Sequence, residues 1–447
     1  MDFLDKLVIP QSSEHIQLLH YLLMLILFLF IPFMSAVFGS TILSLYYKAK
    51  GFKESNNDYL RFSKDVIETL TINKSIGLIL GIVPIITTML IYTQLLQGTN
   101  SNVSTYLIFS TFFMSIGMIL IYTYRYSMMF MGIYDALKNF KPEDDSVARE
   151  ISRFRKANIG LSGKSGRYGL VFIFIGMWLF ISSVTIAAYP EMWGKYNIIS
   201  LMFSWEVLAH LFSFLSSATA LTGAAIFFAF FYWEGGKHLQ EGFYSDFVKK
   251  TATRVAFTGA LLMPLFMMID IFAFPSSSLS GAIFFFATIA LILLFIAYHF
   301  LYSMIKNKDL KYSGTVFYMI LFTLLALIIK DQLVLQNSTE VQTAVMNVNF
   351  EKMMAELTGE GKAVKAISGE QIYKNICSSC HSFDHKIVGP PYEQTLPKYE
   401  GHIDRLIAFI RNPVQNNPGY PPMPNPGLTP VEADSIAHYI MRTYKQK

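Results

Sequence analysis

The sequence predicts an all-α protein in which a polytopic membrane bundle precedes a small helical domain. Apolar residues make up 53% of the 447 positions, charged residues only 15%, and the mean hydropathy is +0.40. This composition is too apolar for a water-soluble globule. The apolar residues lie in long continuous runs and do not alternate with polar ones, which favours spanning helices over a β-barrel.

Eight apolar runs are long enough to cross a bilayer, because a spanning helix needs about 20 mostly apolar residues. Their approximate limits are 16–47, 75–97, 104–130, 168–189, 204–232, 253–274, 280–305 and 313–332. We therefore predict a transmembrane domain at 1–332 and a polar connector at 333–365, either a short helix or an extended tether. The soluble composition beyond it predicts a third segment at 366–447.

The basic residues predict the orientation of these helices. Almost all loop lysines and arginines follow the first, third, fifth and seventh runs, whereas the N-terminal segment and the opposite loops contain only Lys6 and Lys195. The positive-inside rule places the basic loops in the cytoplasm and both termini outside. In a bacterial inner membrane the C-terminal domain would then be periplasmic. The basic cytoplasmic loops explain the net charge of +5. No nucleic-acid partner is therefore expected.

The C-terminal segment contains a haem attachment motif. The two cysteines of the chain, Cys377 and Cys380, are directly followed by His381 in a Cys-x-x-Cys-His pattern. Two thiols on one turn can bond the two vinyl groups of a porphyrin, and the adjacent imidazole then faces the iron as an axial ligand. A zinc or redox cysteine pair is the alternative, but the sequence lacks the further soft ligands that it would need.

The residues around this motif extend the argument. They comprise a helix start at 369–373, a Gly-Pro-Pro segment at 389–391, a Pro-Pro-Met-Pro loop at 421–424 and a final helix around 428–444. In this arrangement the segment resembles a class I cytochrome c. The resemblance implies one covalent haem c, with Met423 as the second axial ligand and the Pro390 carbonyl orienting His381. Haem of this kind is attached outside the cytoplasm, in agreement with the loop charges.

Three histidines, His20, His210 and His299, lie within the predicted membrane helices, where ionisable groups are rare and usually functional. His20 and His210 are near the outer ends of the first and fifth helices, at similar depth. They could hold a b-type haem between them, or each could bond an interfacial carbonyl or lipid headgroup. Glu206 and Asp270 are candidates for carrying protons from a quinol to the outside, or are simply carboxylates at headgroup level.

The membrane part loosely resembles the first subunit of cytochrome bd quinol oxidases. The similarity rests on His20-Tyr21 in a long first helix, the 73–81 entry to the second helix, and His210 in the fifth. It implies quinol as the electron source. The Gly-Arg-Gln-Pro-Trp stretch and the long external loop of that family are missing. Eight helices followed by a cytochrome c are also similar to the membrane-bound urate-oxidising family.

Three functions compete at this point. The leading hypothesis is part of a quinol:acceptor oxidoreductase that sends electrons from membrane quinol through haem b and haem c to a soluble or membrane-bound redox partner outside. The second is a structural subunit that anchors a cytochrome c to other subunits of a respiratory or photosynthetic complex. The third is a membrane oxidase of a small substrate. It requires a polar cluster in mid-membrane, which the sequence does not reveal.

Overall fold

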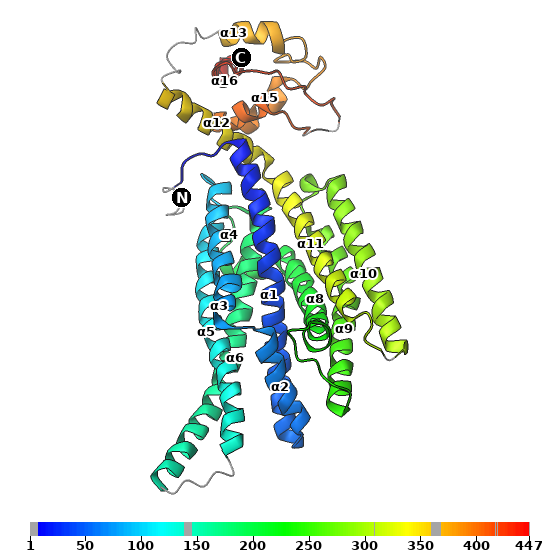
Figure 1. Ribbon diagram of the computed structural model, residues 1–447. Coiled ribbons are helices and arrows are strands. Elements are labelled where there is room, and N and C mark those ends of the chain that lie inside the picture. Colours follow the sequence, from blue (N-terminus) through cyan, green and yellow to red (C-terminus); the bar gives the residue numbers. More distant parts are fainter. Residues whose placement is uncertain are drawn as a thin grey trace.

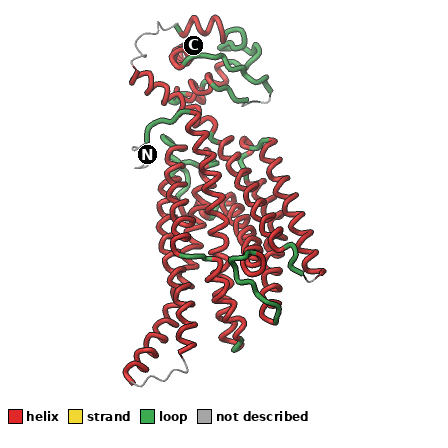
Figure 2. The backbone as a smooth tube through the Cα atoms, viewed as in Figure 1, coloured by secondary structure: helices red, strands yellow, loops and turns green. Residues whose placement is uncertain are grey.

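The protein is a tall helical bundle with a small helical domain at one end (Figure 1). The computed structural model describes residues 8–137, 145–307, 309–358, 368–415, 417 and 419–446. Across these ranges every regular element is a helix, and none is a strand (Figure 2). The all-α prediction is confirmed.

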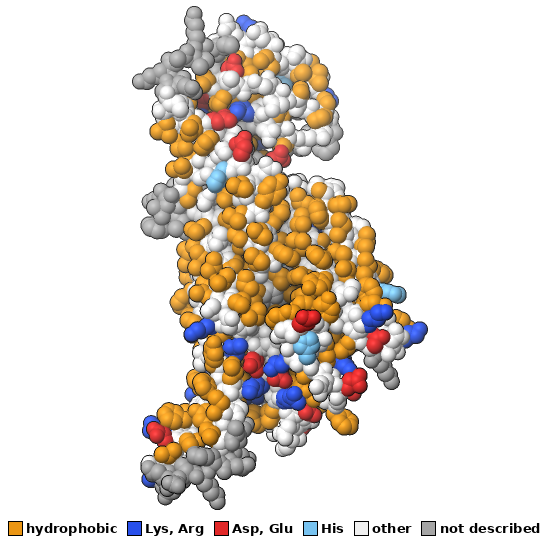
Figure 3. Space-filling view, in the orientation of Figure 1, with side chains coloured by type: hydrophobic (Ala, Val, Ile, Leu, Met, Phe, Trp, Pro, Cys, Tyr) orange, Lys and Arg blue, Asp and Glu red, His pale blue; other side chains and the backbone are white. Residues whose placement is uncertain are grey.

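In the part of the chain that the structure describes, eight helices are long and apolar enough to span a membrane, as predicted. They are α1 (Ser13–Glu54), the continuous α3–η2–α4 (Lys74–Leu95), α5 (Val103–Ala136), α6 (Asp145–Ala187), α8–η5 (Trp205–Tyr232), α9 (Phe243–Ala273), α10 (Gly281–Asn307) and α11 (Ser313–Ser338). Apolar side chains cover the visible face of the bundle in a broad belt (Figure 3). Several helices begin earlier or end later than the apolar runs, because helical structure continues into their polar flanks.

The remaining described elements are shorter and lie mostly in loops or in the C-terminal domain. They are α2 (Asn57–Leu70), η4 (Pro190–Met192), α7 (Ile198–Met202), η6 (Ser276–Ser278), α12 (Glu340–Thr358), α13 (Gly369–Ile372), η8 (Tyr373–Cys377), α14 (Tyr392–Thr395), η9 (Pro397–Tyr399), α15 (Ile403–Arg411) and α16 (Pro430–Gln446). Lysine and arginine side chains gather at the end of the bundle opposite the C-terminal domain (Figure 3).

Helices α8 and α9 approach each other so closely that glycine is required at the contact. A Cβ atom on Gly223 would lie 2.2 Å from the Ala256 nitrogen, and one on Gly259 would lie 2.1 Å from the Ala220 nitrogen. Small residues at such crossings let two backbones pack directly, which is how membrane helices gain van der Waals contact without a hydrophobic driving force.

This contact predicts a strong asymmetry between two glycine-to-alanine substitutions. Gly223→Ala must push α8 and α9 apart and is expected to destabilise the protein by about 1–3 kcal/mol through overpacking. Gly163→Ala is the matched control, because a Cβ atom there meets nothing within 4 Å and alanine has the higher helix propensity. Thermal unfolding in detergent should show a melting temperature below that of the wild type for Gly223→Ala. The melting temperature of Gly163→Ala should not be lowered. Equal melting temperatures would contradict the packing argument.

The described part of the connector, which extends to Thr358, is helical, the first of the two forms considered for it. Helix α11 continues past residue 332 to Ser338, and α12 follows it. Helix α12 packs on α15 and is held there by the Arg411–Glu351 ion pair and by Lys352, whose ammonium nitrogen lies 3.4 Å from Asp404. The predicted boundary at 365/366 lies outside the described residues.

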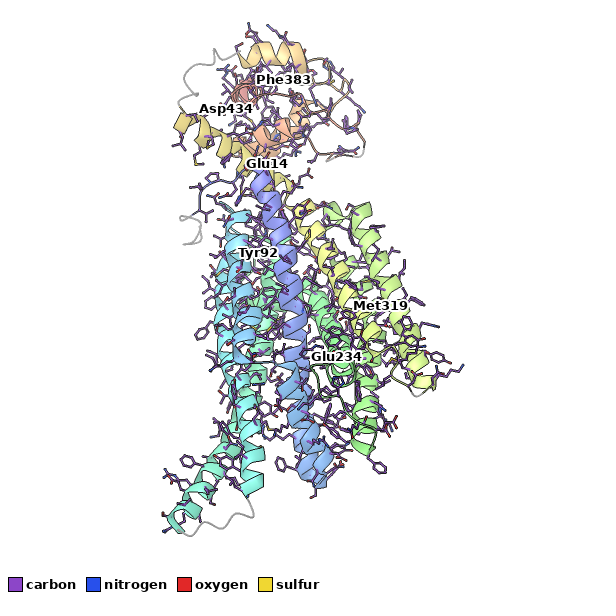
Figure 4. All side chains as sticks on the ribbon, viewed as in Figure 1. Glu14, Tyr92, Glu234, Met319, Phe383 and Asp434 are labelled. Atoms are coloured by element: carbon purple, nitrogen blue, oxygen red, sulfur yellow. The ribbon has the colours of Figure 1, made fainter. Side chains whose placement is uncertain are left out.

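The C-terminal domain is docked on the bundle through α12. The backbone nitrogen of Ser13 at the start of α1 donates a 2.9 Å hydrogen bond to the Asn347 side chain, and Gln342 donates one of 2.8 Å to the Gln97 carbonyl. Glu14, in the first turn of α1, lies directly beneath the domain, whereas Phe383 and Asp434 mark its interior and its α16 side (Figure 4). The first turn of α1 and the loop after α4 therefore contact α12, on which the C-terminal domain packs.

Candidate functional site

The cysteine motif is held by a network of backbone hydrogen bonds. The Ser368 side chain caps α13 by accepting from the Gln371 nitrogen, and the helix continues through the π-helical turn η8 to Cys377. The His381 nitrogen then donates to the Cys377 carbonyl at 2.9 Å, and the Gly389 nitrogen donates to the Cys380 carbonyl at 2.9 Å. These bonds fix both thiols and the imidazole on one turn.

The His381 ring is oriented by its neighbours. Its Nδ1 lies 3.0 Å from the Pro390 carbonyl oxygen, and its ring stacks on Tyr392 with centroids 5.3 Å apart and planes 10° apart. A Cβ atom on Gly389 would lie 2.3 Å from His381 Cε1, so glycine is needed for this approach. With Nδ1–H donating to a carbonyl, Nε2 is left as the nitrogen that can bind a metal.

One cavity of 370 Å³ brings the two halves of the predicted ligand set together. The cavity is lined by Cys377, Cys380, His381 and Pro390. Met423, from the proline-rich loop, also lines this cavity. Its remaining walls are largely apolar and include Leu406, Phe409, Ile410, Ile436 and Ile440. The volume falls within the range of about 300–1,000 Å³ typical of small-molecule and cofactor sites. Two thiols, an imidazole, a thioether and an apolar wall fit a covalently bound haem.

The cavity is a low-polarity environment. Burial raises the pKa of the Cys377 thiol to about 11 and that of Tyr399, another lining residue, to about 12. In both cases the charged form is disfavoured because water is excluded. Phe383 (Figure 4) is buried behind the motif, where its ring contacts those of Tyr373 and Tyr392. Such a wall suits the face of a macrocycle better than a hydrated ion.

His20 and His210, the predicted haem b ligands, do not share a cavity. His20 lines one of 440 Å³ at the end of the bundle, between α1, the α11–α12 junction and α15. His210 lines another of only 110 Å³ inside the bundle, between helices that include α6, α8 and α11. The second space is well below the roughly 300 Å³ of a cofactor pocket. These residues do not fit a haem held between the two imidazoles.

The structure instead places His210 and Asp270 in a buried charged cluster. His210 Nδ1 lies 3.2 Å from Asp270 Oδ1 and 2.9 Å from the Glu206 carbonyl oxygen. Glu206 thus contributes its backbone to this cluster. Asp270 in turn accepts a 2.6 Å hydrogen bond from Lys330, whose ammonium nitrogen also lies 2.9 Å from Asp331.

Lys330 and Asp331 are the members of the cluster that the sequence did not reveal. The apolar run ends near 332, so Lys330 and Asp331 look like the polar end of a helix. Helix α11 continues to Ser338, however, and buries Lys330 inside the bundle, with the partly exposed Asp331 beside it. The Lys330 side chain is only 1% exposed. A Lys-Asp pair within an otherwise apolar helix was the available signal, with Asp270 on a neighbouring helix as its complement. A membrane oxidase of a small substrate would require a polar cluster in mid-membrane, and the sequence revealed none. The structure has this charged cluster, which lies near the C-terminal-domain end of the bundle.

Comparison with known proteins gives matches to the C-terminal domain. The family model for "Cytochrome C oxidase, cbb3-type, subunit III" matches residues 365–440. Cytochrome c-551 of Azotobacter vinelandii is 35% identical over 78 residues, which are 17% of this chain and 95% of that protein. The cytochrome c-551 of Pseudomonas denitrificans is 35% identical over 79 residues, which are again 17% of this chain and 95% of that protein. That of Stutzerimonas stutzeri is 36% identical over 80 residues, 17% of this chain and 77% of the relative.

No solved structure matches the chain. The matched segment coincides with the domain whose cavity holds both thiols, the imidazole and the thioether, and the cytochrome c-551 proteins are covered over most of their length. Such a domain carries covalent haem c, and its attachment to eight apolar helices makes the protein a multi-pass, membrane-anchored electron carrier. Through residues 365–440, the chain belongs to the cytochrome c family.

Proposed function

We propose that the protein takes electrons from a membrane quinol and passes them through haem c to a one-electron acceptor outside the cytoplasm. The observation that carries this proposal is the 370 Å³ cavity, in which Cys377, Cys380, His381 and Met423 meet. The haem supplies one-electron chemistry, with Met/His ligation favouring a high potential. The chain holds it by thioether bonds, orients the imidazole through Pro390 and keeps water away with apolar walls.

The membrane location in this proposal is a bacterial inner membrane with the cytochrome c domain in the periplasm. The lysines and arginines at the opposite end of the bundle support that orientation through the positive-inside rule (Figure 3). Quinol is a reasonable donor because it is dissolved in the same lipid that surrounds the eight helices. The acceptor, soluble or membrane-bound, is reached from the exposed side of the domain.

In this electron-transfer route no step uses a haem b. His20 and His210 line separate cavities, and the His210 Nδ1 contacts a carbonyl and a carboxylate. A direct route from quinol to haem c needs neither histidine as an iron ligand. A pyridine haemochrome spectrum of the purified protein is expected to show haem c alone, and a haem b component would contradict the direct route.

The test of the function is anaerobic reduction of haem c by a quinol. Full-length protein in detergent is expected to show haem c reduction when mixed with duroquinol, whereas the double variant Cys377→Ser/Cys380→Ser should carry no porphyrin adduct by mass spectrometry. Ascorbate, which reduces exposed haem directly, is the control for an intact haem. A protein reduced by ascorbate but not by duroquinol would favour the alternative, a subunit that only anchors a cytochrome c in a larger complex.

A further inference from the structure

A second cavity, of 440 Å³, lies where the membrane bundle meets the cytochrome c domain. Three helices form most of its walls: α1 contributes Gln17, His20 and Tyr21, α12 contributes Asn347, and α15 contributes Arg411. Its volume is within the range of about 300–1,000 Å³ for small-molecule sites. Nothing in the cytochrome c fold alone requires this cavity, because two of its walls come from outside that domain.

His20 is one of the residues lining this cavity that have a polar atom without a partner. Its side chain is only 4% exposed, and its Nδ1 has no hydrogen-bond partner among the described residues. Leaving a buried polar group unpaired is energetically unfavourable. Arg411 repeats the pattern, since its Nε is buried without a partner although its terminal nitrogens pair with Glu351. Both residues line the cavity, so a small rotation of either side chain would bring its unpaired nitrogen to a hydroxyl or carbonyl group of a ligand.

Helix α15 separates this cavity from the haem cavity. Leu406, Phe409 and Ile410 line the haem cavity, whereas Ala408 and Arg411 on the same helix line the interface cavity. An α-helix with its side chains is about 10–12 Å wide. A redox-active ring in the interface cavity would therefore lie about one helix width from the haem edge.

The interface cavity also borders the lipid. Tyr21 lines it and is 57% exposed, and Leu18 and Leu25 on the same helix are exposed to a similar degree. These residues belong to the apolar part of α1, so their exposed surface faces lipid. An amphipathic ring carried by lipid can thus enter from the α1 side and meet polar groups inside.

We propose that the interface cavity binds the ring of a quinol and that the imidazole of His20, which lines the cavity, accepts a proton from one of its hydroxyls. This inference rests on the proposed function and names its donor site. On oxidation the two O–H bonds break and the ring loses two electrons to become a quinone. One proton goes to His20 and the other to water at the domain surface. The electrons leave singly to haem c, which the external acceptor reoxidises between the two transfers.

His20→Ala tests the proton acceptor in the full-length, haem-loaded protein. The rate of haem c reduction by duroquinol is expected to fall about 100-fold, a typical effect of removing a general base. His15→Ala is the matched control, because His15 lies on the same helix but is exposed and bonded to Gln94. Reduction by ascorbate should be the same in all three proteins.

Binding gives a readout that does not depend on electron transfer. Calorimetric titration of the oxidised protein with duroquinone should give a Kd at least tenfold higher for Ala344→Phe, which fills the cavity from α12, than for the wild type. Unchanged binding and unchanged reduction in both variants would overturn the site while leaving the quinol route intact. Duroquinone binding that Ala344→Phe removes, in a protein that duroquinol does not reduce, would instead support the site and overturn the proposed function.

Discussion

Replacing Met423 with histidine is expected to lower the midpoint potential of haem c by roughly 0.2–0.3 V, a substantial part of the approximately 0.8 V that axial ligands span. A thioether stabilises ferrous iron, so Met/His ligation raises the potential, whereas a second imidazole removes that stabilisation. Met423 lies in a proline-rich loop and lines the same cavity as His381. An anaerobic spectroelectrochemical titration measures the shift.

The control for this substitution is Met354→Leu, which changes an exposed methionine on α12. It should leave both the potential and the haem spectrum unchanged. If Met423→His also leaves them unchanged, Met423 is not an iron ligand. A fall in potential would in addition disfavour electron transfer from quinol to the haem, since 59 mV corresponds to a tenfold change in a one-electron equilibrium.

Replacing Lys330 with methionine is expected to destabilise the membrane domain by about 3–5 kcal/mol. Lys330 is the cation between Asp270 and Asp331, at 2.6 and 2.9 Å, and its side chain is almost fully buried. Removing it leaves the Asp270 and Asp331 carboxylates close together with only the His210 imidazole beside Asp270. A buried charge that loses its partner costs more than an intact pair contributes. Thermal unfolding in detergent should show a markedly lower melting temperature.

A surface lysine provides the matched control. Lys374→Met removes an ion pair with Glu370 that is exposed on both sides, and solvent screening makes such pairs nearly neutral for stability. The melting temperature of that variant should not change measurably. A Lys330→Met protein as stable as wild type would mean that water or protons already neutralise the Asp270 and Asp331 carboxylates.

The haem ligands on the histidine side could be predicted because their chemistry is local. Cys377, Cys380 and His381 lie within five positions, and the turn that the porphyrin needs is short enough to be encoded in that spacing. The predicted second ligand, Met423, is 42 residues further along. Met423 was identified through a family resemblance and its proline context, and the structure brings it to the same cavity as His381.

The membrane histidines show where sequence reasoning fails. His20 and His210 have similar predicted depth, but depth does not determine which neighbouring helix each imidazole faces. A helix in lipid can be apolar on all sides, so the periodicity that reveals the buried face of a soluble helix is weak. The structure directs His20 to the domain interface and His210 to Asp270.

The sequence by itself determined the eight spanning helices, the soluble C-terminal segment and the attachment motif. Lipid demands long uninterrupted apolar runs and haem attachment demands adjacent ligands, so both requirements are written in consecutive residues. Only the tertiary structure decided that Lys330 pairs with Asp270, sixty positions away, and that α1, α12 and α15 enclose a cavity beside the haem domain. Those contacts depend on how helices rotate and cross, which close packing between distant segments fixes.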